Sequence, residues 1–137
     1  MGGLMSIKTS ILFPQFKNII SLSPAFWFGY PRVLYDVKNL SNESSTYLYT
    51  GKKEGHIFGD HVKNIFSNDW DLDFSNNDDF YYSGVKKIED SLKSNNKKVI
   101  FSYQENGHHN ETSWATAILD ILAVSYTHLT LPTTTPV

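Results

Sequence analysis

Helical and strand-like hydrophobic patterns alternate along this chain, and the alternation limits the possible folds more than any other sequence feature. The helical patterns cover 4–13, 33–40, 80–92 and 114–122, and the β-branched and aromatic runs typical of strands cover 16–22, 46–50 and 99–103. Strands that alternate with helices usually pair in parallel through right-handed crossovers. The sequence therefore predicts an α/β fold, with a mostly parallel sheet flanked by helices.

Composition excludes several classes of protein. The chain has 137 residues, 40% of them hydrophobic and 15% aromatic, which is enough for one domain with a real core. It has no cysteine, so disulfides, thiolate metal sites and cysteine nucleophiles are excluded. The net charge of −2 comes with scattered lysines, which argues against a nucleic-acid surface. No apolar run is long enough to predict a membrane span.

The segment 105–111 places two histidines, His108 and His109, between the predicted strand 99–103 and the helix that contains Trp114. Loops that join strands to helices are where α/β proteins carry chemistry, because rigid elements hold the loop side chains on both sides. In the alternative interpretation both histidines are surface residues and Asn110 caps the helix. These residues alone leave both interpretations open.

Four patches resemble esterases of the α/β-hydrolase fold, the group that includes esterase D and enterochelin-esterase-like enzymes. They are Met1-Gly2-Gly3-Leu4, similar to the end of the elbow motif Gly-x-Ser-Met-Gly-Gly-Leu; the strand and aromatic loop 20–27; the strand 47–54, which ends in Gly-x-x-Glu; and Gly107-His108-His109-Asn110-Glu111 with Trp114. Their order along the chain is that of the family. The resemblance covers the chain from Met1 to about Leu122.

The resemblance implies a carboxylesterase-type serine hydrolase whose nucleophilic serine would be the residue directly before Met1. Residues 1–123 are then expected to form the incomplete C-terminal part of the domain, inactive by itself. Met1 and Gly2 would belong to the elbow, where the backbone N–H after the serine stabilises the oxyanion. Phe26 and Trp27 are expected to line the substrate pocket. Ser6 and Ser10, inside a predicted helix, cannot replace the elbow serine.

The same resemblance assigns the general base and the acid. His109 takes the family position directly before Asn-Glu, so it is expected to be the base, with His108 a solvent-facing neighbour. Glu54 follows a strand and precedes the histidine, as the order nucleophile, acid, histidine requires. Asp60 is the alternative acid. Glu105 is a weaker third candidate because it lies on the histidine's own loop.

Segment 124–137 breaks the helical pattern with threonine and proline, and it is similar to a translated sequencing adapter. We therefore expect 124–137 to be an unstructured, non-native tail. The expected partner is a small ester substrate, with no cofactor, no nucleic acid and no membrane. The oligomeric state and the compartment stay open, with the cytoplasm favoured.

Two other functions compete with the esterase hypothesis. One is a non-catalytic binding module on the same fold, since a fold does not fix a function. The other is a metal site of histidine and aspartate side chains. Its candidate ligands are His56, Asp60, His61, His108 and His109. No two of the histidines have the helical spacing of the motif His-Glu-x-x-His, so the sequence does not favour a metal.

Overall fold

The computed structural model describes residues 1–59, 71–72 and 74–130, and the side chains as far as residue 125. The helices are α1 (Gly2–Leu12), α2 (Arg32–Asp36), α3 (Asn77–Ser94) and α4 (Glu111–Thr130), with short 3-10 helices η1 (Phe26–Phe28), η2 (Val37–Asn39) and η3 (Gly55–Phe58). The strands are β1 (Asn18–Leu22), β2 (Ser45–Gly51) and β3 (Lys98–Gln104).

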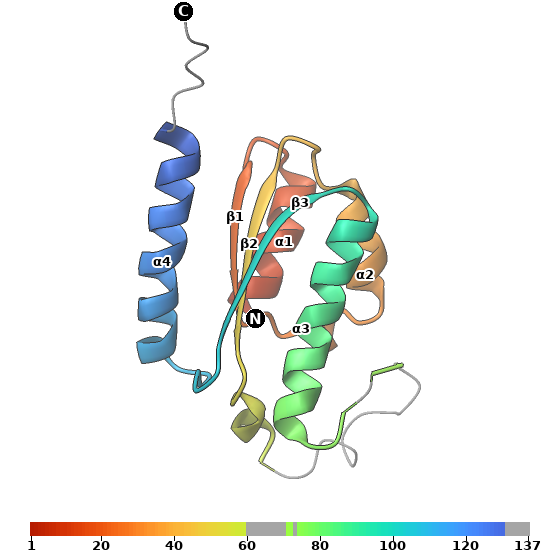
Figure 1. The fold of residues 1–137 in the computed structure, drawn as a ribbon. Coiled ribbons are helices and arrows are strands. Elements are labelled where there is room, and N and C mark those ends of the chain that lie inside the picture. The colour runs from red at the N-terminus through yellow and green to blue at the C-terminus, as the bar shows by residue number, and fades with distance from the viewer. Residues whose placement is uncertain (60–70, 73, 131–137) are drawn as a thin grey trace, which may run out of the picture.

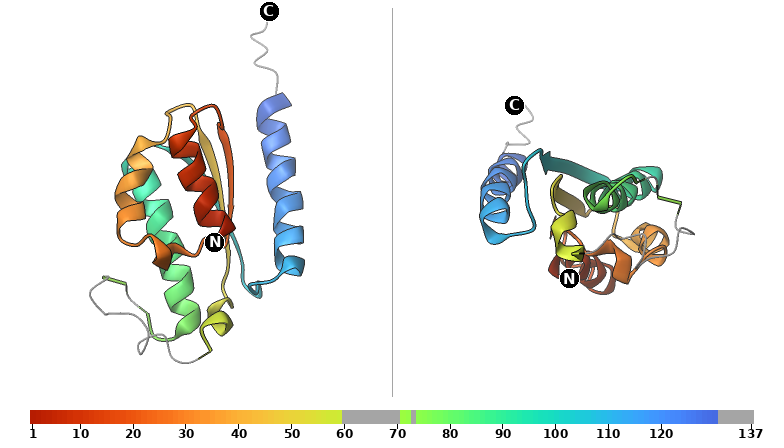
Figure 2. Two further views of the ribbon diagram at one scale, coloured as in Figure 1. Left: turned by 180° about the vertical axis from the view of Figure 1, so that it is seen from behind. Right: turned by 90° about the horizontal axis from the view of Figure 1, so that it is seen from below.

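The three strands form one sheet in the order β1-β2-β3, and both neighbouring pairs are parallel. The register aligns Leu22 with Tyr49 and Tyr49 with Ser102, so the strands end at one common edge. Helices cover both faces of this sheet (Figures 1 and 2). The predicted α/β class with a parallel sheet is confirmed at this level.

Each face of the sheet buries its own hydrophobic cluster. Along β2, Leu48 faces the larger cluster, which contains buried side chains of α1, α2 and α3. Tyr47 and Tyr49 face the other side, where α4 contributes Ala117 and Ile121. Alternate strand residues point to opposite faces, so β2 supplies both cores.

The helix ends follow local capping chemistry. The Asn76 side chain accepts a hydrogen bond from the Asp79 backbone N–H at the start of α3, at 2.9 Å. At the start of α4, the side-chain oxygen Oδ1 of Asn110 accepts from the Ser113 N–H at 2.9 Å. Both are N-caps, which satisfy one of the free N–H groups of a first turn. Asn110 is therefore the N-cap of α4, as one of the two interpretations of this loop expected.

The clearest differences from the predicted boundaries concern three segments. The first strand begins at Asn18 rather than at Phe16, and segment 33–40 divides into α2 and η2. The expectation that residues 124–130 are unstructured is wrong, because α4 continues to Thr130. No proline interrupts this stretch before Pro132, so the backbone hydrogen bonds of the helix can continue. The rest of the predicted tail lies outside the described residues.

Among the helices of the described chain, none combines the length and the apolarity that crossing a bilayer requires.

Candidate active site at the carboxyl ends of the strands

The loops that follow β2 and β3 contact each other at the carboxyl edge of the sheet. The Lys53 N–H donates to the Gly107 carbonyl oxygen at 2.9 Å, and the Lys52 N–H donates to the Gln104 carbonyl at 3.0 Å. A Cβ atom on Gly51 would lie 2.2 Å from the Gly107 oxygen, so only glycine permits this approach. The loop after β2, which carries Glu54 (the acid loop), and the loop after β3, which carries His109 (the histidine loop), are thus held together by their backbones.

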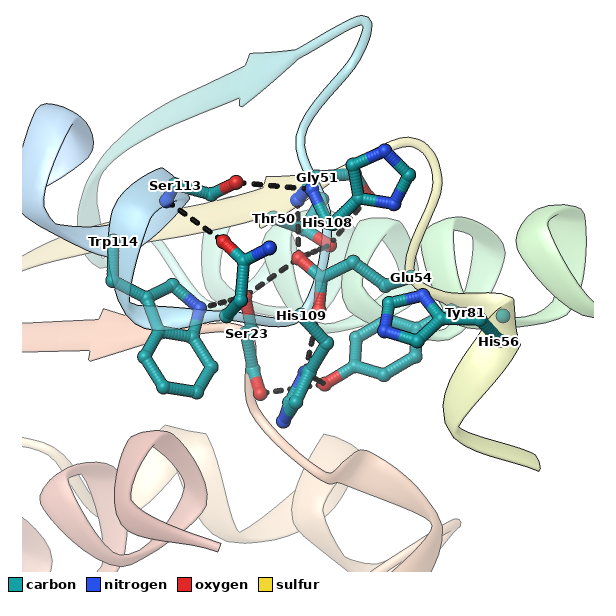
Figure 3. Close-up of polar contacts among 12 residues, drawn as sticks. Ser23, Thr50, Gly51, Glu54, His56, Tyr81, His108, His109, Ser113 and Trp114 are labelled. Atoms are coloured by element: carbon teal, nitrogen blue, oxygen red, sulfur yellow. Dashed lines mark hydrogen bonds and ion pairs between the residues drawn. The ribbon is translucent and has the colours of Figure 1, made fainter. Parts of the chain in front are cut away.

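This contact brings Glu54 and His109 together across 55 residues of sequence. Their Oε2 and Nδ1 atoms are 2.7 Å apart. The Glu54 side chain is 0% exposed and that of His109 is 24% exposed. Figure 3 shows the carboxylate enclosed by neighbouring side chains. The two residues that the sequence analysis paired as acid and base are therefore in direct contact.

The buried Glu54 carboxylate is surrounded by donors. Its Oε1 atom accepts hydrogen bonds from the Gly51 N–H at 2.5 Å and from the Ser23 hydroxyl at 2.6 Å, with the Thr50 hydroxyl at 3.5 Å. A buried carboxylate is tolerated only when such partners replace its hydration. The loop is fixed further by the Gly55 N–H, which donates to Asp78 Oδ1 at 2.7 Å.

The hydrogen bonds define the tautomer of His109. An ionised carboxylate only accepts, so the Nδ1 atom that faces Glu54 carries a proton. In a neutral imidazole the other nitrogen, Nε2, then has a free lone pair. Among the described residues no hydrogen bond engages Nε2. This is the arrangement that a general base requires.

A cavity of about 200 Å³ lies beside His109. It is lined by Met1, Gly2, Gly3, Leu22, Ser23, His109 and Trp114. A Cβ atom on Gly3 would lie 2.3 Å from the Leu22 carbonyl oxygen, so the start of α1 rests directly on the end of β1. The structure thus brings the predicted elbow residues Met1 and Gly2 to the same cavity as His109.

The sequence analysis assigned no role here to Ser23 and Tyr81, and it named Trp114 only as part of the histidine-loop motif. The Tyr81 hydroxyl donates to the Ser23 carbonyl oxygen at 2.6 Å and lies 3.3 Å from His109 Nδ1. Burial, together with the nearby charge of Glu54, raises the pKa of Tyr81. The Trp114 indole N–H donates to the Ser23 hydroxyl oxygen at 3.0 Å. In the sequence, Ser23-Pro24 indicates only the end of a strand. The contacts of Ser23 with Tyr81 and Trp114 therefore become visible only in the folded structure.

The other acid and base candidates lie elsewhere. Glu105 is exposed and pairs with the Lys52 ammonium at 3.0 Å. His108 is exposed, and its ring centroid is 5.6 Å from that of His56. Asp60 lies outside the described residues.

No serine hydroxyl described in the structure bonds to His109. Ser6 donates to the Gly3 carbonyl and Ser10 to the Ser6 carbonyl, so both hydroxyls belong to the backbone of α1. The Ser23 side chain lines the cavity, but its hydroxyl is directed at Glu54. None of these three serines has the position of a nucleophile.

The two residues expected in the substrate pocket have different surroundings. Phe26 is 0% exposed and packs in the larger core cluster, and a pocket role for it stays a prediction. The aromatic loop folds inward because Gly84 leaves room on α3 for the Phe26 ring, which a Cβ atom there would approach to 2.0 Å. Trp27 is half-buried against Tyr81, at a centroid distance of 5.3 Å. A pocket role for Trp27 stays a prediction.

Within the described ranges, no three histidine, aspartate or glutamate side chains gather as metal ligands do. His56 and His108 are neighbours, whereas Asp60 and His61 lie outside the described residues.

Comparison with known proteins finds no matching family model, no matching curated protein and no matching solved structure. The chain is therefore characterised by its own site: a buried acid–histidine pair where a parallel sheet ends.

Proposed function

We propose that this chain carries the acid and the general base of a serine carboxylesterase of the α/β-hydrolase fold, and that the serine precedes Met1 in a longer chain. The observation that carries the proposal is the hydrogen bond of 2.7 Å between the buried Glu54 and His109. The Nε2 atom of His109 has no partner among the described residues, and the cavity beside it contains the elbow-like Met1 and Gly2.

In the proposed reaction the serine hydroxyl oxygen attacks the ester carbonyl carbon while Nε2 of His109 takes the hydroxyl proton. The tetrahedral intermediate collapses, the bond to the alcohol oxygen breaks, and the alcohol leaves with that proton. Water then attacks the acyl-serine, giving a proton to Nε2. The serine oxygen takes this proton back as the carboxylic acid departs. Glu54 stays ionised and stabilises the imidazolium.

The start of α1 suits the stabilisation of an oxyanion. The first N–H groups of a helix have no acceptor within the helix, and its N-terminus carries partial positive charge. In the elbow the N–H directly after the serine donates to the oxyanion, and here that residue would be Met1. The cavity joins this end of α1 to His109.

The order of the elements also supports the proposed fold. Glu54 follows β2 and His109 follows β3, which agrees with the order nucleophile, acid, histidine. β1 lies at one edge of the described sheet. In an α/β-hydrolase the strand that leads to the serine would pair with this edge.

The test begins with the coding sequence directly upstream of Met1, where we expect Gly-x-Ser. The longer chain that it specifies should hydrolyse p-nitrophenyl acetate. His109→Ala and Glu54→Gln should each lower kcat by a factor on the order of 10⁴, as the loss of a triad member does. The matched control is His108→Ala, which removes the exposed neighbouring ring and should leave kcat nearly unchanged.

Turnover that survives His109→Ala would contradict the proposal, and so would an upstream sequence without the serine. A longer chain that binds the ester without cleaving it would instead be a binding module.

A further inference from the structure

Ser23 connects four elements at the end of β1. Its backbone N–H donates to the Tyr49 carbonyl on β2 at 2.8 Å, and its carbonyl accepts from Tyr81 on α3 at 2.6 Å. Its hydroxyl bonds to Trp114 on α4 at 3.0 Å and to Glu54 before η3 at 2.6 Å. The residue is 2% exposed, so these bonds replace water entirely. Figure 3 shows Ser23 between the indole ring and the carboxylate.

The hydrogen bonds of this group have a fixed direction. An indole N–H can only donate, so the Ser23 oxygen is the acceptor from Trp114. The single hydroxyl proton of Ser23 is then free to point to Glu54 Oε1, which an ionised carboxylate accepts. Donation therefore runs from Trp114 to Ser23 and from Ser23 to Glu54. His109 donates to the other oxygen of the same carboxylate.

We propose that Ser23 and Trp114 are positioning residues that hold Glu54, and through it His109, in the geometry of an acid–base pair. The inference rests on the proposed function for its purpose, but the positioning itself is a property of this chain. Neither residue touches the reacting atoms in the proposed chemistry.

The geometry of the carboxylate explains why Ser23 is needed. Oε1 is held by Ser23 and by the Gly51 N–H, so Oε2 is the oxygen that faces His109. Rotation of the carboxylate would break these three bonds together. With the Ser23 hydroxyl removed, the Gly51 N–H becomes the main anchor of Oε1. The carboxylate can then turn and release the Nδ1 proton of His109.

Trp114 contributes in two ways. Its N–H keeps the Ser23 hydroxyl directed at Glu54, and its ring packs edge-on against the His109 ring, with centroids 4.9 Å apart at 85°. Phenylalanine at this position would keep an aromatic ring beside His109 while losing the indole N–H and part of the ring area. The substitution Trp114→Phe therefore removes the hydrogen bond and retains much of the packing.

The backbone of Ser23 adds a second observation. Its φ angle is +42°, in the left-handed region that side chains other than glycine and asparagine rarely adopt. Glycine would suit this conformation better, yet the position carries a hydroxyl. Residues held in such conformations cluster at functional sites. The substitution Ser23→Gly removes the hydroxyl while favouring the same backbone, which makes it the sharpest variant.

The experiment is NMR spectroscopy of the ¹⁵N-labelled chain at about pH 8, where an ordinary imidazole is neutral. In the unmodified chain His109 should show the single Nδ1–H tautomer and a slowly exchanging Nδ1 proton. In Ser23→Gly that proton should exchange about tenfold faster or more, the factor expected from a lost hydrogen bond to a charged group. The ring should also become a mixture of tautomers.

Two comparisons show whether Trp114 acts through Ser23. Trp114→Phe should accelerate the exchange less than Ser23→Gly does. The double variant should match Ser23→Gly alone, because contacts in one network are not additive. Ser44→Ala is the matched control, since the buried Ser44 hydroxyl has no hydrogen-bond partner among the described residues. His56 and His108 are internal controls within the same spectra.

An unchanged His109 tautomer and exchange rate in Ser23→Gly would overturn the proposal. If Trp114→Phe accelerates the exchange of the His109 proton by the same factor in the Ser23→Gly chain as in the unmodified chain, Trp114 does not act through Ser23. That result would overturn the role proposed for Trp114. If circular dichroism shows that Ser23→Gly is unfolded, the Trp114→Phe variant provides the test. An unchanged exchange rate of the His109 Nδ1 proton in Trp114→Phe would then contradict the proposal. The spectra do not depend on catalysis. A failed esterase assay would therefore contradict the proposed function without changing the result for Ser23 and Trp114.

Discussion

At the scale of single residues, one carboxylate organises the site. Glu54 is fully buried and accepts hydrogen bonds from Ser23, Gly51 and His109. Hydrogen bonds from these partners offset the free-energy cost of burying the charge, and removing one of them leaves part of that cost uncompensated. The site is therefore sensitive to any residue that touches Glu54, including those far from it in sequence.

The tyrosines around Glu54 predict a loss of stability in alkali. Burial raises the pKa of Tyr81 above the ordinary value of 10.0, and burial also raises that of Tyr49 to about 12. Above pH 10 the unfolded chain then loses these protons before the folded chain does. The free energy of unfolding should fall by about 1.4 kcal/mol per pH unit for each such tyrosine.

Urea unfolding between pH 8 and about pH 11 measures this slope. Tyr81→Phe should remove one tyrosine's share of the decline, although it also lowers stability at pH 8 by losing the bond to Ser23. Tyr35→Phe, at a ring that is 68% exposed, is the control. A slope that is the same in Tyr81→Phe and in the unmodified chain would contradict the assignment.

The sequence identified the acid–histidine pair but not the residues that hold it. His109 and Glu54 each follow a strand in a recognisable motif, and such signals are local. Contacts between different helices and strands bring Ser23, Tyr81 and Trp114 to the site. No spacing in the sequence indicates such contacts. The sequence places Phe26 in a pocket because aromatic residues suit both pockets and cores, whereas its packing against α3 depends on the room left at Gly84.

At the scale of elements, the approach of two loops sets the site. The order of helices and strands was predictable because hydrophobic periodicity is local, and the parallel pairing followed from their alternation. The first and last residues of the helices and strands were predicted less accurately than their order. The split of α2 from η2 and the continuation of α4 to Thr130 depend on backbone hydrogen bonds that composition does not reveal.

The contact between the acid and histidine loops predicts the effect of one glycine. Gly51→Ala would place a Cβ atom 2.2 Å from the Gly107 oxygen, and backbone atoms there cannot move without separating the loops. Overpacking of this kind costs about 1–3 kcal/mol. We expect a loss of that size in urea unfolding, together with loss of the single His109 tautomer.

Gly2→Ala is the matched control, because a Cβ atom at Gly2 meets nothing within 4 Å among the described residues. It should leave stability unchanged or slightly raised, since alanine favours a helix more than glycine does. Equal stability of the Gly51→Ala chain and the unmodified chain would show that the loops do not depend on this contact.

At the scale of the whole molecule, the two faces of the sheet are unequally covered. α3 buries seven residues, five of which belong to the larger cluster. Among the described side chains of α4, only Ala117 and Ile121 are buried, while Leu119 and Leu122 are 70% and 49% exposed. Figures 1 and 2 show α4 alone on its face of the sheet. The helix that carries Trp114 is therefore the less firmly attached one.

Hydrogen exchange measured by mass spectrometry should reflect this difference. Local opening needs less free energy where few apolar contacts are lost. Backbone amides of α4 should therefore exchange well before those in the middle of α3, near Val85 and Ile88. Equal protection of the two helices would mean that α4 is held by contacts beyond those of the described side chains.

In the proposed esterase His109 serves a serine that precedes Met1, and covalent labelling can detect that serine. The longer chain is treated with a fluorophosphonate, and its intact mass is recorded beside that of His109→Ala. We predict one adduct per chain, on that serine, and a reaction slowed by orders of magnitude in His109→Ala. The absence of an adduct, or equally fast labelling of both chains, would contradict the proposed function.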